Sequence, residues 1–128
     1  MKPDSKGARP VNLDLGTISL PVTAYASIAH RITGVAMFLA SFLMLWALDR
    51  SLASEADFAM LASQLGSPVG RGMLWLIAVV LSYHALAGVK HLIMDMGIGE
   101  TLKGGVLAAR AVFALALVAA VAWGALIW

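Results

Sequence analysis

Three long stretches of this chain contain no Asp, Glu, Lys or Arg, and they restrict its fold more than any other feature. They cover residues 32–48, 72–89 and 111–128, which are 17, 18 and 18 residues long. An α-helix of 18 residues spans about 27 Å, close to the roughly 30 Å hydrocarbon core of a bilayer. A soluble domain has about 25% charged residues, whereas this chain has 12%. We therefore expect three membrane spans.

Helices are the expected form of these spans. Inside a bilayer every backbone N–H and C=O needs a partner within the protein, which only helices or a closed β-barrel provide. The three stretches do not alternate between apolar and polar residues, as barrel strands do. We expect an all-α membrane-anchor domain with a polar segment at 1–20, spans at about 22–50, 70–96 and 105–128, and a short helix outside the membrane within 51–70.

The positions of the basic residues predict the orientation of the spans. Lys and Arg are concentrated before the first span and around the link between the second and third spans, whereas acidic residues offset them in the first link. The positive-inside rule then places the N-terminus in the cytoplasm and the C-terminus in the periplasm. Indole rings prefer membrane interfaces. This topology puts all four tryptophans near the outer one: Trp46, Trp75, Trp123 and Trp128.

The chain lacks the residues that several kinds of redox centre need. It contains no cysteine, which excludes disulfides and thiolate-held iron–sulfur clusters in this chain. We also find no glycine-rich nucleotide-binding motif and no apolar core of a cleavable signal peptide in the first twenty residues. We therefore expect the first span to remain part of the fold.

Ionisable side chains interrupt the second span in the stretch SYHALAGVKHLIMD. At about 100° per residue, His84, Gly88, His91 and Asp95 fall within an arc of about 60° and form one stripe. His84 lies about 16 Å from the inner end of the helix, whereas His91 is nearer the surface. Mid-membrane ionisable groups are rare and usually functional, and imidazole is a common axial ligand of haem iron. A histidine that only bridges two helices is the alternative, and it applies more to His91 than to His84.

A second polar group lies on the first span, in the stretch YASIAHRITG. Ser27, His30, Arg31 and Gly34 share an arc of about 100°. Alone, Arg31 could be an arginine that reaches the headgroups at the membrane edge. The neighbouring hydroxyl and imidazole favour a binding role, because such a group can donate to a quinone carbonyl or pair with a haem propionate. The first span begins on the side where the second ends, so both polar groups could face one cavity.

The motifs of this chain resemble a known family. The stretches RPVNLDL, PVTAYASIAHRITG and YHALAGVKHLIMD closely resemble the cytochrome b subunit, the larger membrane anchor, of bacterial succinate dehydrogenase (respiratory complex II). The resemblance runs through the whole chain in order. It implies a membrane-anchor subunit of succinate:ubiquinone oxidoreductase in the bacterial inner membrane, where catalytic activity belongs to the complex. Family members often carry Arg at the position of Lys90. The lysine keeps the positive charge, so only a bidentate contact made by that arginine is in doubt here.

The resemblance also implies site residues, cofactors and partners. It makes His84 the axial ligand of a haem b iron, places Ser27 and Arg31 in the ubiquinone site, and places His30 and Arg31 near the haem propionates. We expect His91 to contact a propionate or the haem pocket. The implied partners are a flavoprotein with covalent FAD, an iron–sulfur protein and a smaller membrane anchor; FAD and iron–sulfur clusters belong only to these partners. Membrane lipid is an expected partner, and nucleic acid is not.

The second haem ligand is expected from the smaller anchor, so that the two anchors share the haem. His84 and His91 lie about 10 Å apart along one stripe and cannot hold one iron from both sides. His30 is expected about 5–8 Å shallower than His84, which disfavours that pair unless the first span tilts. A His30–His91 pair fits the depths better, but it leaves His84 without its implied role.

Two other functions remain open at this point. One is the anchor of a fumarate reductase that uses menaquinol and runs the reverse reaction. The other is a non-redox membrane protein whose histidines only bridge helices or move protons. An absorption spectrum separates the second from a haem protein.

Overall fold

The computed structural model describes residues 18–128, which form four helices. They are α1 (Val22–Ala53), α2 (Glu55–Gly66), α3 (Pro68–Asp95) and α4 (Leu102–Ile127). This part of the chain contains no strand, so the predicted all-α architecture is confirmed. Residues 1–17 of the expected polar segment lie outside the described range.

Three of the helices are long and apolar enough to cross a membrane. They are α1, α3 and α4, with 32, 28 and 26 residues, and each coincides with one of the charge-free stretches. The predicted number of spans is therefore confirmed. Large apolar side chains such as Phe38, Leu45 and Leu117 are exposed on their outer faces, as expected for helices that contact lipid or other subunits.

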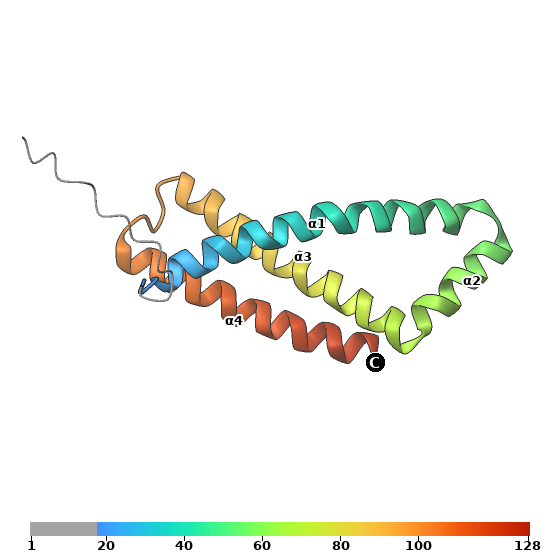
Figure 1. Ribbon diagram of the computed structural model, residues 1–128. Coiled ribbons are helices and arrows are strands. Elements are labelled where there is room, and N and C mark those ends of the chain that lie inside the picture. The colour runs from blue at the N-terminus through green and yellow to red at the C-terminus, as the bar shows by residue number, and fades with distance from the viewer. Residues whose placement is uncertain (1–17) are drawn as a thin grey trace, which may run out of the picture.

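The helices α1 and α3 cross, and α2 connects their ends on the side where they diverge (Figure 1). The crossing is close because two glycines lie there. A Cβ atom on Gly34 would lie 3.2 Å from Cε1 of His84, and one on Gly88 would lie 3.7 Å from Nε2 of His30. Residues without a side chain allow membrane helices to approach closely.

The short helix expected within residues 51–70 is α2. The Ser54 hydroxyl accepts a hydrogen bond from the Asp57 backbone N–H at 3.0 Å and begins this helix. The Ser67 hydroxyl likewise accepts from the Gly70 backbone N–H at 3.1 Å and begins α3. These caps satisfy amide groups that have no partner inside the first helical turn.

Small buried side chains and two tryptophans join α3 to α4. The core contains Tyr83, Ala87, Val112 and Ala116, with Ala29 and Leu86 packed against it. Trp75 Nε1 donates a hydrogen bond to the Ala120 carbonyl at 2.9 Å, and Trp123 Nε1 donates to the Ser82 hydroxyl at 3.0 Å. These contacts hold α3 against α4 and thereby fix the position of the α3 histidines.

Candidate functional site

Three histidines from two helices meet where α1 and α3 cross. The His30 ring of α1 stacks on the His84 ring of α3, with ring centroids 4.2 Å apart and an interplanar angle of 22°. The His30 ring also lies 5.2 Å from the His91 ring, at 39°. His30 is therefore in contact with both histidines of the α3 stripe. Within residues 18–128, no three His, Asp or Glu side chains are arranged to hold a metal ion directly.

The depth that the sequence predicted for His30 is wrong. An offset of about 5–8 Å from His84 was expected from the rise per residue, but the ring centroids are only 4.2 Å apart. The sequence analysis allowed such a close approach only for a tilted first span, and α1 does cross α3 so that the His30 ring contacts both His84 and His91. The nitrogen lone pairs of an imidazole lie in the ring plane. Two stacked rings therefore cannot direct their lone pairs at one iron between them.

The Nδ1 atom of His84 is held by α1. It lies 3.2 Å from the His30 carbonyl oxygen and 3.2 Å from the Thr33 hydroxyl oxygen. A carbonyl oxygen can only accept, so the first contact is a hydrogen bond when Nδ1 carries the proton. Nε2 then carries the lone pair. A ring fixed through Nδ1–H to a carbonyl, with a lone pair on Nε2, is the usual state of a metal-ligating histidine.

His30 carries a buried nitrogen without a partner among the described residues. Its Nε2 is the one buried side-chain polar atom in residues 18–128 that makes no hydrogen bond. Most buried polar atoms in proteins have a partner, because an unpaired one costs free energy. This nitrogen faces Gly88 of α3, and a polar group from outside could reach it only if the His30 ring turned.

Ser27 and Arg31 lie one turn apart on α1, on either side of His30 in the sequence. Ser27 is half-buried and Arg31 is exposed. Within residues 18–128 the only ion pair joins Arg50 to Asp57 at 3.6 Å, so no carboxylate of this part pairs with Arg31. The hydroxyl and the guanidinium share one helix face and can both donate hydrogen bonds to a single ligand.

The sequence reasoning missed the roles of Thr33 and Tyr83. Thr33 contacts His84 through its hydroxyl. The buried Tyr83 hydroxyl donates to the Ala26 carbonyl at 2.9 Å and ties α3 to α1 beside His84. Two features of the sequence could have indicated these roles. Thr33 follows His30 by three residues, which puts both on one helix face, and Tyr83 directly precedes His84.

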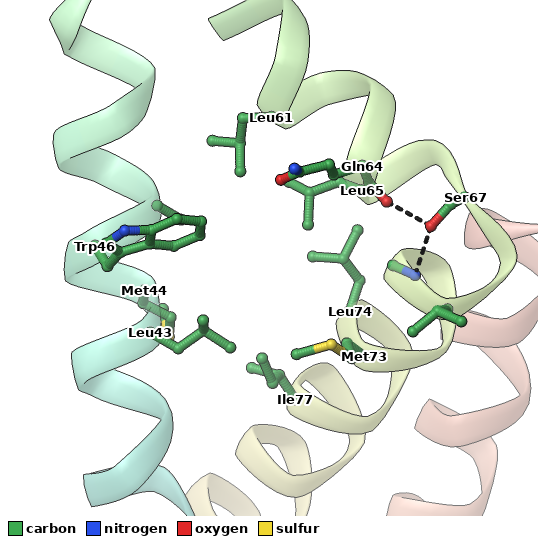
Figure 2. Close-up of a pocket in the computed structure, with 13 residues that line it drawn as sticks. Leu43, Met44, Trp46, Leu61, Gln64, Leu65, Ser67, Met73, Leu74 and Ile77 are labelled. Atoms are coloured by element: carbon green, nitrogen blue, oxygen red, sulfur yellow. Dashed lines mark hydrogen bonds between the residues drawn. The ribbon is translucent and has the colours of Figure 1, made fainter. Parts of the chain in front are cut away.

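A separate cavity of about 320 Å³ lies away from the histidines, where α1 and α3 diverge toward α2. Figure 2 shows Trp46 of α1 facing Leu61 and Leu65 of α2 across it. The lining is apolar apart from Gln64, Ser67 and the Trp46 indole N–H, and it contains no ionisable side chain. It therefore offers no imidazole for iron and no charged group for a quinone.

Comparison with known proteins agrees with the resemblance. Residues 5–123 match the family described as "Succinate dehydrogenase/Fumarate reductase transmembrane subunit". The succinate dehydrogenase cytochrome b556 subunit of Coxiella burnetii is 37% identical over 124 residues, which cover 94% of this chain and 97% of that protein. The corresponding subunit of Paracoccus denitrificans is 34% identical over 121 residues (91% and 90% covered). That of Rickettsia felis is 30% identical over 100 residues (74% and 73%).

These matches confirm the predicted resemblance and the predicted location as a multi-pass protein of the bacterial inner membrane. They also imply that other subunits of the complex are its partners. The chain belongs to the family of succinate dehydrogenase and fumarate reductase transmembrane subunits, and within that family it is similar to the cytochrome b556 subunits.

Proposed function

We propose that this chain anchors a succinate:ubiquinone oxidoreductase, supplies His84 as one axial ligand of haem b, and forms part of the ubiquinone site with Ser27 and Arg31. One observation carries the haem proposal: Nδ1 of His84 contacts a backbone carbonyl, which leaves the lone pair on Nε2. The name cytochrome b556 given to the relatives supports the same cofactor.

The residues around the crossing fit a haem b group. A ring fixed through Nδ1 presents Nε2 as an axial ligand. The guanidinium of Arg31, and the buried Nε2 of His30 once its ring turns, are suited to donate hydrogen bonds to propionate carboxylates. His91 contacts the His30 ring and so belongs to the same wall of the pocket. When bound, the haem would supply a one-electron carrier next to the quinone site.

The second axial ligand is assigned to the smaller anchor subunit. His30 stacks on a face of the His84 ring, so its lone pairs run beside those of His84 rather than toward them. His91 lies on the same helix as His84 and on the same stripe. Neither histidine can approach the far face of a haem that His84 ligates. The haem is therefore shared between the two anchors.

Ser27 and Arg31 bind the quinone in this proposal. The carbonyl oxygens of ubiquinone accept hydrogen bonds from the hydroxyl and the guanidinium. Reduction to the quinol takes two electrons and two protons, and the Arg31 cation stabilises negative charge that builds on a carbonyl oxygen before its proton arrives. The electrons come from succinate through the FAD and iron–sulfur clusters of the partner flavoprotein and iron–sulfur subunit. The names of the relatives favour this direction over fumarate reduction with menaquinol.

Absorption spectra of the purified complex test the ligand assignment. The reduced complex should show the α and Soret bands of haem b. His84→Ala should lose or severely change these bands, because the iron loses a strong axial ligand. His91→Ala is the matched control on the same stripe and should keep most of the haem. Haem that survives His84→Ala unchanged but disappears in His91→Ala would overturn the assignment, and a wild-type complex without haem bands would overturn the haem proposal.

Expression without partners tests the shared haem. The chain made alone should show no stable low-spin haem, and co-expression of the smaller anchor should restore it. A particular histidine of that anchor should be required for the restoration. A stable bis-histidine spectrum in the lone chain would contradict sharing and would make His30 the next candidate for the second ligand.

A further inference from the structure

The hydroxyl of Thr33 has three polar neighbours on two helices. Its oxygen lies 2.9 Å from the Ala29 carbonyl oxygen, 3.0 Å from the His30 carbonyl oxygen and 3.2 Å from Nδ1 of His84. A hydroxyl has one proton, and both carbonyls can only accept. When Nδ1 of His84 carries its proton, the Thr33 proton points back into α1 and the hydroxyl oxygen accepts from the Nδ1–H of His84.

The His84 ring is consequently fixed on two sides. The Nδ1–H edge faces two acceptors, the His30 carbonyl and the Thr33 hydroxyl, both at 3.2 Å. Beside the same ring, a Cβ on Gly34 would lie 3.2 Å from Cε1, which is closer than an ordinary van der Waals contact. With Nδ1 protonated, contacts with α1 hold both the ring and its proton.

We propose that Thr33 is a positioning residue that, together with the His30 carbonyl, sets the tautomer, rotation and donor strength of His84 and so tunes the reduction potential of the haem. This inference rests on the proposed ligation of haem by His84. Acceptors at Nδ1–H increase the basicity of the opposite nitrogen of a ligating imidazole. A more basic Nε2 stabilises the ferric state relative to the ferrous state and lowers the reduction potential.

Ser41, on the same helix, shows what the Thr33 hydroxyl would do if its role were only structural. Ser41 also bonds back into α1, donating to the Phe38 carbonyl at 2.6 Å, and this contact is exposed. Hydroxyls in membrane helices commonly bond in this way without further function. What distinguishes Thr33 is its additional contact with a histidine of α3. Ser41→Ala is therefore the control for loss of a helix-internal hydroxyl bond.

The test uses the complete complex with Thr33→Val, Thr33→Ser and Ser41→Ala. Thr33→Val keeps the shape of the side chain but loses the acceptor, and it should retain haem with a higher midpoint potential. We expect a roughly threefold to tenfold change in the reduction equilibrium, which is about 30–60 mV for a one-electron couple. The low-spin electron paramagnetic resonance signal of the oxidised haem should shift with it. Thr33→Ser and Ser41→Ala should have the midpoint potential and resonance signal of the unmodified complex. If Thr33→Val does not assemble, Thr33→Ala takes its place.

The outcomes separate this inference from the proposed function. If His84→Ala removes the haem while Thr33→Val leaves both the potential and the resonance signal unchanged, ligation by His84 stands and the positioning role is overturned. If Thr33→Ser shifts the potential as far as Thr33→Val does, packing rather than the hydroxyl is responsible, which also overturns it. If His84→Ala keeps a normal haem, the proposed ligation itself fails.

Discussion

Two regions of the molecule differ sharply: the α1–α3 crossing itself, and the space where these helices diverge toward α2. The histidine crossing, made by His30, Thr33, His84 and His91, brings three imidazoles into contact and holds one of them by hydrogen bonds. The apolar wedge is the cavity of about 320 Å³ that α1, α2 and α3 enclose where the helices diverge. The wedge is lined almost entirely by apolar side chains (Figure 2), whereas the three histidines lie together at the crossing.

The difference shows how to find the site of a membrane subunit. A polar group inside a membrane helix costs free energy unless it is paired, so its retention indicates a role. A cavity between diverging helices needs no such explanation, because it follows from their geometry. The remaining walls of a site shared between subunits belong to the partners. In the proposed function, the site of this chain therefore lies at the polar crossing rather than in the apolar wedge.

The largest effect is expected for Arg31, which follows His30 on α1. Arg31→Ala should lower succinate:ubiquinone turnover by about 100-fold, a typical loss when a donor to a developing oxyanion is removed. Oxidation of succinate with an artificial acceptor should stay near normal, because that chemistry occurs in the partner subunits. Ser27→Ala should be milder, at roughly fivefold, since it removes one neutral donor.

Arg50→Ala is the control for charge removal on the same helix. Arg50 pairs with Asp57 at 3.6 Å and both side chains are partly exposed, so its loss should have little effect. Equal loss of quinone and artificial-acceptor activity in Arg31→Ala would indicate failed assembly and would leave the quinone role unsupported. Quinone turnover that falls as far in Arg50→Ala as in Arg31→Ala would remove the distinction between the regions.

The helices could be predicted from sequence because a bilayer leaves few alternatives. A stretch such as 72–89 without charges has the length of one span, and its helical form follows from the need to pair the backbone. The short helix expected within residues 51–70 was predicted in the same way, and the structure has it as α2. These predictions depend only on local composition, and packing between the helices does not change them.

The contacts within the site could not be predicted in the same way. The sequence placed His84 and His91 on one stripe, but the stacking of His30 on His84 depends on the crossing angle of α1 and α3. That angle is set by packing between elements far apart in the chain, including the close approach at Gly34. The role of Thr33 was hidden for the same reason, since Ser41 makes a similar bond within α1 without contacting α3.

A smaller difference is expected between two glycines, one at the crossing and one near the wedge. Gly34→Ala would place a Cβ 3.2 Å from a His84 ring that its hydrogen bonds hold in place, and overpacking of this kind costs about 1–3 kcal/mol. The haem bands should shift and should be lost at lower temperature during thermal denaturation. A Cβ added to Gly72 of α3 would have nothing within 4 Å, so Gly72→Ala should be neutral or slightly stabilising. Identical melting curves and band positions for the two variants would mean that the ring of His84 is free to move.

The smallest effect on the site is expected from a change inside the apolar wedge. Leu61 of α2 is 8% exposed and lines the cavity. Leu61→Ala removes packing and enlarges the cavity, which should cost about 2 kcal/mol of stability. Distant sites that share no partners behave independently, so haem content and quinone turnover should change by less than about twofold. Thermal denaturation, the haem spectrum and succinate:ubiquinone turnover of one preparation measure all three. If Leu61→Ala left stability intact but reduced quinone turnover as Arg31→Ala does, the wedge itself would hold quinone, and the enclosed cavity rather than the polar crossing would mark the site.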